Sequence, residues 1–109
     1  MSEIKNITEK LIAFRDERDW AQFHNPKDLA IALNIEVSEL LEVFLWKEHQ
    51  DADKEKIKEE LADVFAYAFL LADKYDLDVE EIVIDKINRN AEKYPVEKAK
   101  GTAKKYDKL

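Results

Sequence analysis

Residues that form turns are almost absent from this chain, and their scarcity limits the folds that it can adopt. Its 109 residues include one glycine and two prolines. A many-stranded β fold needs turns at short, regular intervals, so this composition argues against one. Alanine, leucine, glutamate and lysine are abundant, and they favour long helices. The sequence therefore predicts an all-α fold, with residues 1–109 forming a single domain.

Composition and charge exclude several classes of function. Hydrophobic residues make up 46% of the chain, which is too many for a disordered protein. The net charge of -7 argues against a partner that is a nucleic-acid polymer, because wrapping duplex DNA needs a basic face. Residues 96–109 hold five lysines against Glu97 and Asp107, a balance of +3, so the first 95 residues carry -10. Such a basic tail can bring cations to an acidic site that handles phosphates.

We expect a cytoplasmic protein without membrane segments. The chain has no cysteine, which agrees with a reducing compartment and leaves no thiolate for a metal or a disulfide. The first ten residues, MSEIKNITEK, lack the basic start and apolar core of a signal peptide. The longest apolar stretch, residues 61–72, is interrupted by Asp63 and is too short to cross a bilayer.

Apolar periodicity and capping signals predict four helices and a basic tail, at about residues 3–18, 25–46, 54–75, 78–94 and 96–109. Asn25 can cap the second helix, and Pro26 suits its first position. Asp78 and Glu81 have the spacing of a capping box at the start of the fourth helix. Pro95 ends that helix, because the residue before a proline is disfavoured in the helical conformation.

The most informative residues are acids inside apolar helices. Glu36 and Glu39 are three residues apart on the second helix and therefore share a face, and Trp46 is expected on the same face. Glu60 and Asp63 share a face of the third helix in the same way. A buried carboxylate needs a cation, hydrogen-bond donors or a proton. If the two helices are antiparallel, the four carboxylates converge, and this arrangement predicts a Mg²⁺ site.

Two other interpretations of these acids compete with a Mg²⁺ site. A single ExxE pair more often lines a solvated face, and we expect Glu42, Glu55 and Glu59 to be solvated. The cost of burial favours metal binding for the four acids above. A di-iron bundle needs Glu-x-x-His pairs, whereas neither His24 nor His49 follows a glutamate by three residues. An all-carboxylate site favours a hard, redox-inactive ion, and phosphates often accompany magnesium.

The motif IEVSELLE followed by EELAD resembles the ExxE and ExxD signature of the MazG-like, all-α nucleoside triphosphate pyrophosphohydrolases. The surrounding sequence resembles the dCTP pyrophosphatase branch of that family from Phe14 onward, in RDWAQFHNPKDLAIAL, EVSELLEVFLWK, EELADVFAYAFLLA, KINRNAEKYP and KKYDKL. The resemblance implies a four-helix bundle that assembles as a homotetramer, a dimer of dimers. It also implies cleavage of dCTP to dCMP and pyrophosphate, with Mg²⁺ held by Glu36, Glu39, Glu60 and Asp63.

The resemblance further implies three groups of substrate-binding residues. Those around the base and sugar are Trp20, His24, Trp46 and Tyr67. Those near the phosphates are Lys27, Lys86 and Asn90. Those of a C-terminal segment that could close over the site are Lys104, Lys105 and Tyr106. The chain departs from the family in having lysine for arginine, as at Lys27, and in having Leu11 where the vertebrate-type enzyme has a histidine. The first change loses a bidentate contact with phosphate, and the second bears on base preference.

Alternatives remain open at this point. Trp20 and Trp46 could be ordinary core aromatics, His24 a loop residue and the tail a solvated terminus. One alternative function is a MazG-like hydrolase that accepts a broad range of nucleoside triphosphates. Another is a helical oligomerisation module, without enzymatic activity, whose acidic face binds a basic partner. The expected partners are a nucleoside triphosphate and other copies of the chain.

Overall fold

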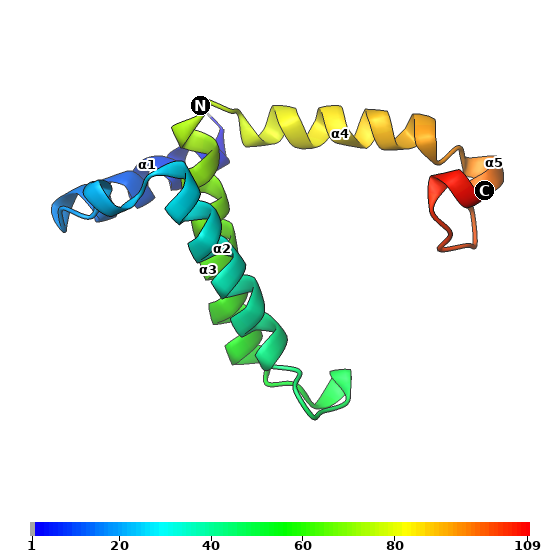
Figure 1. The fold of residues 1–109 in the computed structure, drawn as a ribbon, viewed down its shortest axis with the longest axis horizontal. Coiled ribbons are helices and arrows are strands. Elements are labelled where there is room, and N and C mark those ends of the chain that lie inside the picture. The colour runs from blue at the N-terminus through cyan, green and yellow to red at the C-terminus, as the bar shows by residue number, and fades with distance from the viewer. Residues whose placement is uncertain (1) are drawn as a thin grey trace. The chain divides into compact units, whose positions relative to one another are not determined.

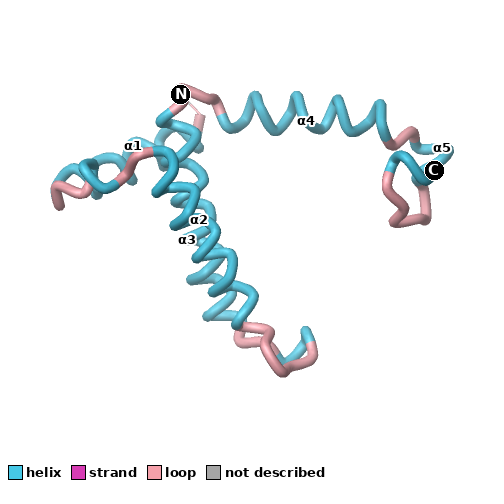
Figure 2. Tube along the Cα trace, in the orientation of Figure 1, coloured by secondary structure: helices cyan, strands magenta, loops and turns pink. Residues whose placement is uncertain are grey.

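The computed structural model describes residues 2–109, and their regular structure is entirely helical. Its long helices are α1 (Glu3–Glu17), α2 (Pro26–Glu42), α3 (Lys54–Lys74) and α4 (Val79–Lys93). A short helix, α5 (Val96–Ala99), and three single 3₁₀ turns complete the chain, at Ala21–Phe23, His49–Asp51 and Tyr106–Lys108. The helices are visible in Figure 1, and Figure 2 shows the short loops between them. The all-α class and the four predicted helices are therefore confirmed.

Local capping explains where these helices begin. The Asn25 side chain accepts a hydrogen bond from the Asp28 amide at 2.9 Å, and Pro26 occupies the first turn of α2. The Asp78 side chain accepts one from the Glu81 amide at 3.1 Å at the start of α4. Each cap satisfies an amide that has no partner within its helix. Both predicted helix starts are therefore confirmed.

The end of α2 differs from the prediction. The helix ends at Glu42, and the next residues form a series of tight turns, with the Leu45 amide donating to the Glu42 carbonyl at 3.1 Å. Trp46 has a φ of 61°, in the left-handed region, and is 93% exposed. The prediction that α2 continues to Trp46 was wrong. This indole does not lie on the helical face that carries Glu36 and Glu39, because the turns carry the backbone away from the helical path.

The first of two compact units ends at Leu77 and contains α1, α2 and α3. Helices α2 and α3 run antiparallel and side by side, joined at one end by the loop that contains His49–Asp51 (Figure 1). Helix α1 packs against α3. The buried apolar residues are Leu29, Val43, Leu70 and Ala72. Packing of α2 on α3 therefore provides most of this core and faces the two acidic motifs toward each other.

The second unit, Asp78–Leu109, consists of α4, α5 and the basic tail. The Tyr106 ring packs edge to face against Tyr94, with ring centres 6.1 Å apart. Lys93 Nζ lies 5.0 Å from the centre of the Tyr106 ring. These contacts hold the last residues against the end of α4.

None of the helices in residues 2–109 combines the length and apolar character needed to cross a membrane. The four-helix bundle, the single domain and the assembly stay predictions.

Candidate functional site

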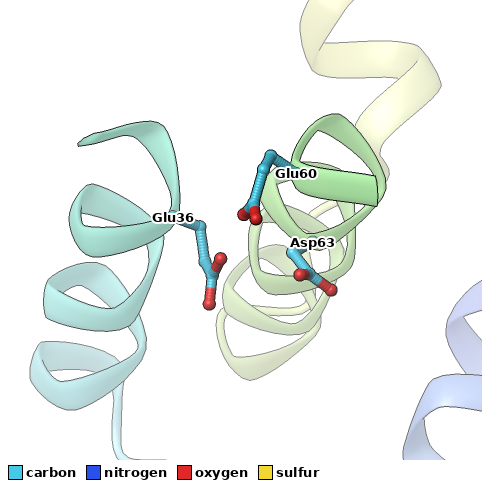
Figure 3. Close-up of side chains that lie close together, drawn as sticks. All are labelled: Glu36, Glu60 and Asp63. Atoms are coloured by element: carbon cyan, nitrogen blue, oxygen red, sulfur yellow. The ribbon is translucent and has the colours of Figure 1, made fainter. Parts of the chain in front are cut away.

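Three carboxylates from two helices meet at the α2–α3 interface. Glu36 projects from α2, and Glu60 and Asp63 project from α3 (Figure 3). One oxygen of each carboxylate lies within 4.8 Å of the corresponding oxygens of the other two. Glu60 and Asp63 are one turn apart and therefore share a face of α3. We call these three residues the acidic cluster.

Burial in the acidic cluster is uneven. Glu36 Oε2 and Glu60 Oε2 are buried, and neither has a hydrogen-bond partner among residues 2–109. Asp63 is exposed, and its neighbours Leu61 and Phe65 are 39% and 52% exposed. The apolar side chains of this part of α3 are therefore not all covered within the single chain. The apolar character of this segment reflected surface that this chain leaves uncovered.

The electrostatics of the acidic cluster disfavour full ionisation. Burial raises the pKa of Glu36 to about 7, helped by the adjacent Glu39 carboxyl group and by the charges of Asp63 and Glu60. Burial also raises the pKa of Glu60, the adjacent Glu39 carboxyl group and the charge of Asp63 add to the effect, and Glu36 partly offsets it. Carboxylates this close repel one another unless a proton or a cation intervenes.

Glu39 lies beside the acidic cluster and is not one of its three members. It lies close enough to Glu36 and Glu60 for its carboxyl group to raise the pKa of both. It also lines an open, mainly polar hollow of about 420 Å³ together with Glu60, Lys47 and Lys56. Sequence reasoning did not single out these two lysines, because nothing in the spacing of either links it to the acidic motifs.

The acidic cluster fits a hard divalent cation. Its donors are all carboxylate oxygens, two of which are buried and unpartnered. Magnesium and calcium prefer oxygen ligands, and a bound cation would compensate the repulsion that raises the pKa values. Glu36, Glu60 and Asp63 would hold such an ion, with Glu39 adjacent to them.

An apolar pocket of about 340 Å³ adjoins the acidic cluster, between α1 and α3. Aromatic side chains dominate its walls. Phe14 and Trp20 meet edge to face with ring centres 5.8 Å apart, and His24 and Tyr67 do so at 6.3 Å. Asp63 also lines the pocket, so the acidic cluster and the apolar pocket share one side chain.

His24 provides polar atoms inside this apolar pocket. Its Nδ1 is buried and has no hydrogen-bond partner among the described residues. Burial lowers the pKa of His24, and the positive charges of Arg15 and Lys74 lower it further. A neutral imidazole offers one donor and one acceptor. In the same pocket, burial raises the pKa of Tyr67, helped by the charges of Glu36, Asp63 and Glu39, so its hydroxyl keeps its proton.

The other predicted substrate-binding residues are exposed, and their roles stay predictions. Trp20 contributes to the pocket and is 45% exposed, whereas Trp46 does not line it. Lys27 lies in the first turn of α2. The remaining five belong to the second unit, where Lys86 and Asn90 are one turn apart on α4. They are Lys86, Asn90, Lys104, Lys105 and Tyr106. Sequence reasoning missed Arg15, although it lies one turn after Leu11 on the pocket side of α1.

Comparison with known proteins identifies the family. A family model for MazG-like proteins matches residues 31–109, and the chain belongs to the MazG-like family. Among curated proteins, it is 40% identical over 104 residues to dCTP pyrophosphatase 1 of Rattus norvegicus and 36% identical to that of Homo sapiens. Each alignment covers 88% of this chain and 61% of the relative, so the chain spans less than two thirds of their length.

A solved structure supports the same assignment. The crystal structure of a pyrophosphatase from Archaeoglobus fulgidus matches with a TM-score of 0.80 and 36% identity, covering 87% of this chain and 94% of that one. The resemblance to the MazG-like family and to its dCTP pyrophosphatase branch is thereby confirmed.

Proposed function

We propose that this protein hydrolyses a nucleoside triphosphate, preferably dCTP, to the monophosphate and pyrophosphate in a Mg²⁺-dependent reaction. The observation that carries the proposal is the side chain shared by two adjoining sites. Asp63 belongs to a carboxylate group suited to a metal–triphosphate complex and also lines an aromatic pocket suited to a base. The family and the names of its relatives support the same chemistry. The biological role would be to remove unwanted nucleotides from the pool.

The proposed chemistry assigns the acidic residues to two tasks. Asp63 and at least two of Glu36, Glu39 and Glu60 would hold the metal. Magnesium, when bound, neutralises charge on the triphosphate and lowers the pKa of water. A water oxygen attacks the α-phosphorus, and the bond from that phosphorus to the oxygen bridging to the β-phosphate breaks. One of Glu36, Glu39 and Glu60 accepts the water proton instead of serving as a ligand. Positioning and electrostatics account for most of the catalysis.

A second candidate is a broad-range hydrolase of the same family. Phe14, Trp20 and Tyr67 offer aromatic faces to the pocket, and stacking on such faces accepts any base. Preference for cytosine needs polar groups that match its edge, of which His24 is one. The two candidates therefore share their phosphate chemistry and differ only in how the pocket reads the base.

We also propose that the active form is a homo-oligomer, most simply a homotetramer. Large apolar side chains are widely exposed in the single chain, including Leu41 at 69% and Phe65 at 52%. On α4, Ile87 is 59% exposed and Val83 51%. Surface of this kind usually marks an interface. Gel filtration with light scattering tests this proposal, and a monomer at micromolar concentration would contradict it.

The decisive experiment is a substrate panel. Purified protein is incubated with each of the eight common nucleoside triphosphates, with Mg²⁺ or with EDTA, and pyrophosphate and phosphate are measured separately. We expect pyrophosphate release that requires Mg²⁺ and a higher kcat/KM for dCTP than for dTTP or the purine nucleotides. Similar values for all eight would favour the broad-range hydrolase. Absence of pyrophosphate release would leave the helical oligomerisation module as the better interpretation.

A further inference from the structure

Arg15 is a nearly buried cation in the wall of the apolar pocket. It lies in the last turn of α1, and its side chain is 12% exposed. It lines the pocket beside Phe14, Trp20 and His24. A guanidinium has five N–H donors, which can serve a ligand held in the pocket. Arg15 therefore places a positive charge and hydrogen-bond donors beside aromatic rings.

The hydrogen bonds of Arg15 leave its donors mostly unused. Its Nε donates to Asp16 Oδ1 at 2.9 Å, and within residues 2–109 the guanidinium makes no other hydrogen bond. Arg18, at the C-cap of the same helix, differs. It donates to the Phe14 carbonyl at 2.9 Å and its guanidinium carbon lies 3.6 Å from the centre of the Phe14 ring, with a side chain that is 41% exposed. The bond to Asp16 leaves both terminal nitrogens of Arg15 available to a ligand.

His24 complements Arg15 within the same pocket. The positive charge of Arg15 acts on the His24 imidazole, whose Nδ1 is buried and unpartnered. In its neutral form the ring can present an acceptor, whereas a guanidinium can present only donors. The surrounding surface is aromatic and aliphatic. The pocket thus combines rings for stacking with one group of paired donors and one acceptor.

We propose that Arg15 is a specificity-determining residue that reads the cytosine edge. Its terminal N–H groups donate to N3 and O2 of the base, and His24 accepts from the exocyclic amino group. This inference rests on the proposed function and adds a residue to it. Thymine and uracil carry N3–H and O4 at these places. In that case two donors would face each other and buried polar groups would remain unpaired, which disfavours binding.

The test compares Arg15→Gln and Arg15→Lys with the matched control Arg18→Gln. The kcat/KM values for dCTP and dTTP are measured with Mg²⁺, and binding of dCMP, dTMP and dGMP is measured by calorimetry in EDTA. We expect Arg15→Gln to lower the dCTP/dTTP ratio by roughly 10- to 100-fold, mainly through dCTP. Arg15→Lys should keep the fold and lower the ratio less, because an ammonium lacks the paired donors. Arg18→Gln should retain the wild-type ratio.

The two readouts separate the inference from the proposed function. Equal losses for dCTP and dTTP in Arg15→Gln would overturn the inference, since they would indicate a contact with phosphate or a structural role. Wild-type protein could bind dGMP more tightly than dCMP and lose this binding in Arg15→Gln. Arg15 would then read guanine and not cytosine, which would also overturn the inference. If wild-type protein releases no pyrophosphate but binds dCMP in an Arg15-dependent way, the proposed function fails and the inference stands. If hydrolysis occurs and neither Arg15 variant changes base preference, the inference alone fails.

Discussion

The acidic cluster and the apolar pocket adjoin each other, but each lacks a different kind of binding partner. In the acidic cluster, burial and the crowding of like charges raise the pKa of Glu36 and of Glu60. In the pocket, the terminal nitrogens of Arg15 and the buried Nδ1 of His24 have donor or acceptor capacity that residues 2–109 leave unused. The first condition calls for a cation, and the second for a ligand with a polar edge. This difference indicates that the acidic cluster would bind the phosphates of a substrate and the apolar pocket its base.

Substitution of Asp63 should lower activity most, because Asp63 belongs to both the acidic cluster and the apolar pocket. We expect Asp63→Asn to lower kcat/KM by about 100-fold or more, since losing even an outer-shell metal contact often costs 10- to 100-fold. The circular dichroism spectrum should remain helical. Glu55→Gln is the matched control, because Glu55 is an exposed acid on the same helix. Near-normal turnover in Asp63→Asn would refute the site assignment.

Glu39→Gln should be the next most damaging change and can define the role of that side chain. Glu39 interacts with Glu36 and Glu60 and lies outside the group of three. We expect kcat/KM to fall by about 100-fold, as for a ligand or a base. Calorimetric titration with Mn²⁺ separates these roles, because loss of a ligand weakens binding whereas loss of a base does not. Activity at the wild-type level would exclude both roles.

His24→Ala should affect the apolar pocket and leave the acidic cluster unchanged. Removing the imidazole takes away the proposed acceptor for the base, so we expect roughly a 10-fold loss of preference for dCTP over dTTP. Affinity for Mn²⁺ should stay within about twofold of wild type, since His24 is not a member of the acidic cluster. Parallel measurements of both quantities would sharpen the boundary between the two regions. A larger change in metal affinity than in base preference would contradict it.

Glu36→Gln should change how the stability of the metal-free protein depends on pH. The pKa of Glu36 is raised from 4.5 to about 7, so between these values the folded state binds more protons than the unfolded state. Stability therefore falls as pH rises from about 4.5 to 7. Glutamine removes this effect and should stabilise the protein at pH 8 by on the order of 1–2 kcal/mol. Urea unfolding in EDTA at pH 4 and pH 8 measures it. A variant less stable than wild type at pH 8 would contradict the expectation.

Trp46→Ala should have the smallest effect on the folded chain. The indole is 93% exposed and does not line the pocket, so we expect the free energy of unfolding to change by less than about 0.5 kcal/mol. If this indole covers the substrate, KM for dCTP should rise several-fold with kcat little changed. Thermal unfolding and steady-state kinetics test the two statements separately. Strong destabilisation would show instead that Trp46 is a packing residue.

Helix starts and the identity of the acidic motifs could be read from the sequence. Caps such as Asn25 and Asp78 act on amides three residues away, so their effect does not depend on the rest of the molecule. The face shared by Glu60 and Asp63 follows from helical periodicity in the same way. The end of α2 was harder to predict. Residues 43–46 continue a helix-like apolar pattern while their backbone turns away, with Trp46 in the left-handed region.

The four helices, their caps and the positions of the acids along them follow from local sequence, because each depends on neighbours within one or two turns. Which side chains meet depends on how the helices pack. Packing of α2 on α3 joins Glu36 to Glu60 and Asp63 and leaves Glu39 beside them. Packing of α1 on α3 places Arg15 in a pocket with Asp63. These contacts depend on the rotation and register of one helix against another, which periodicity within a single helix does not specify.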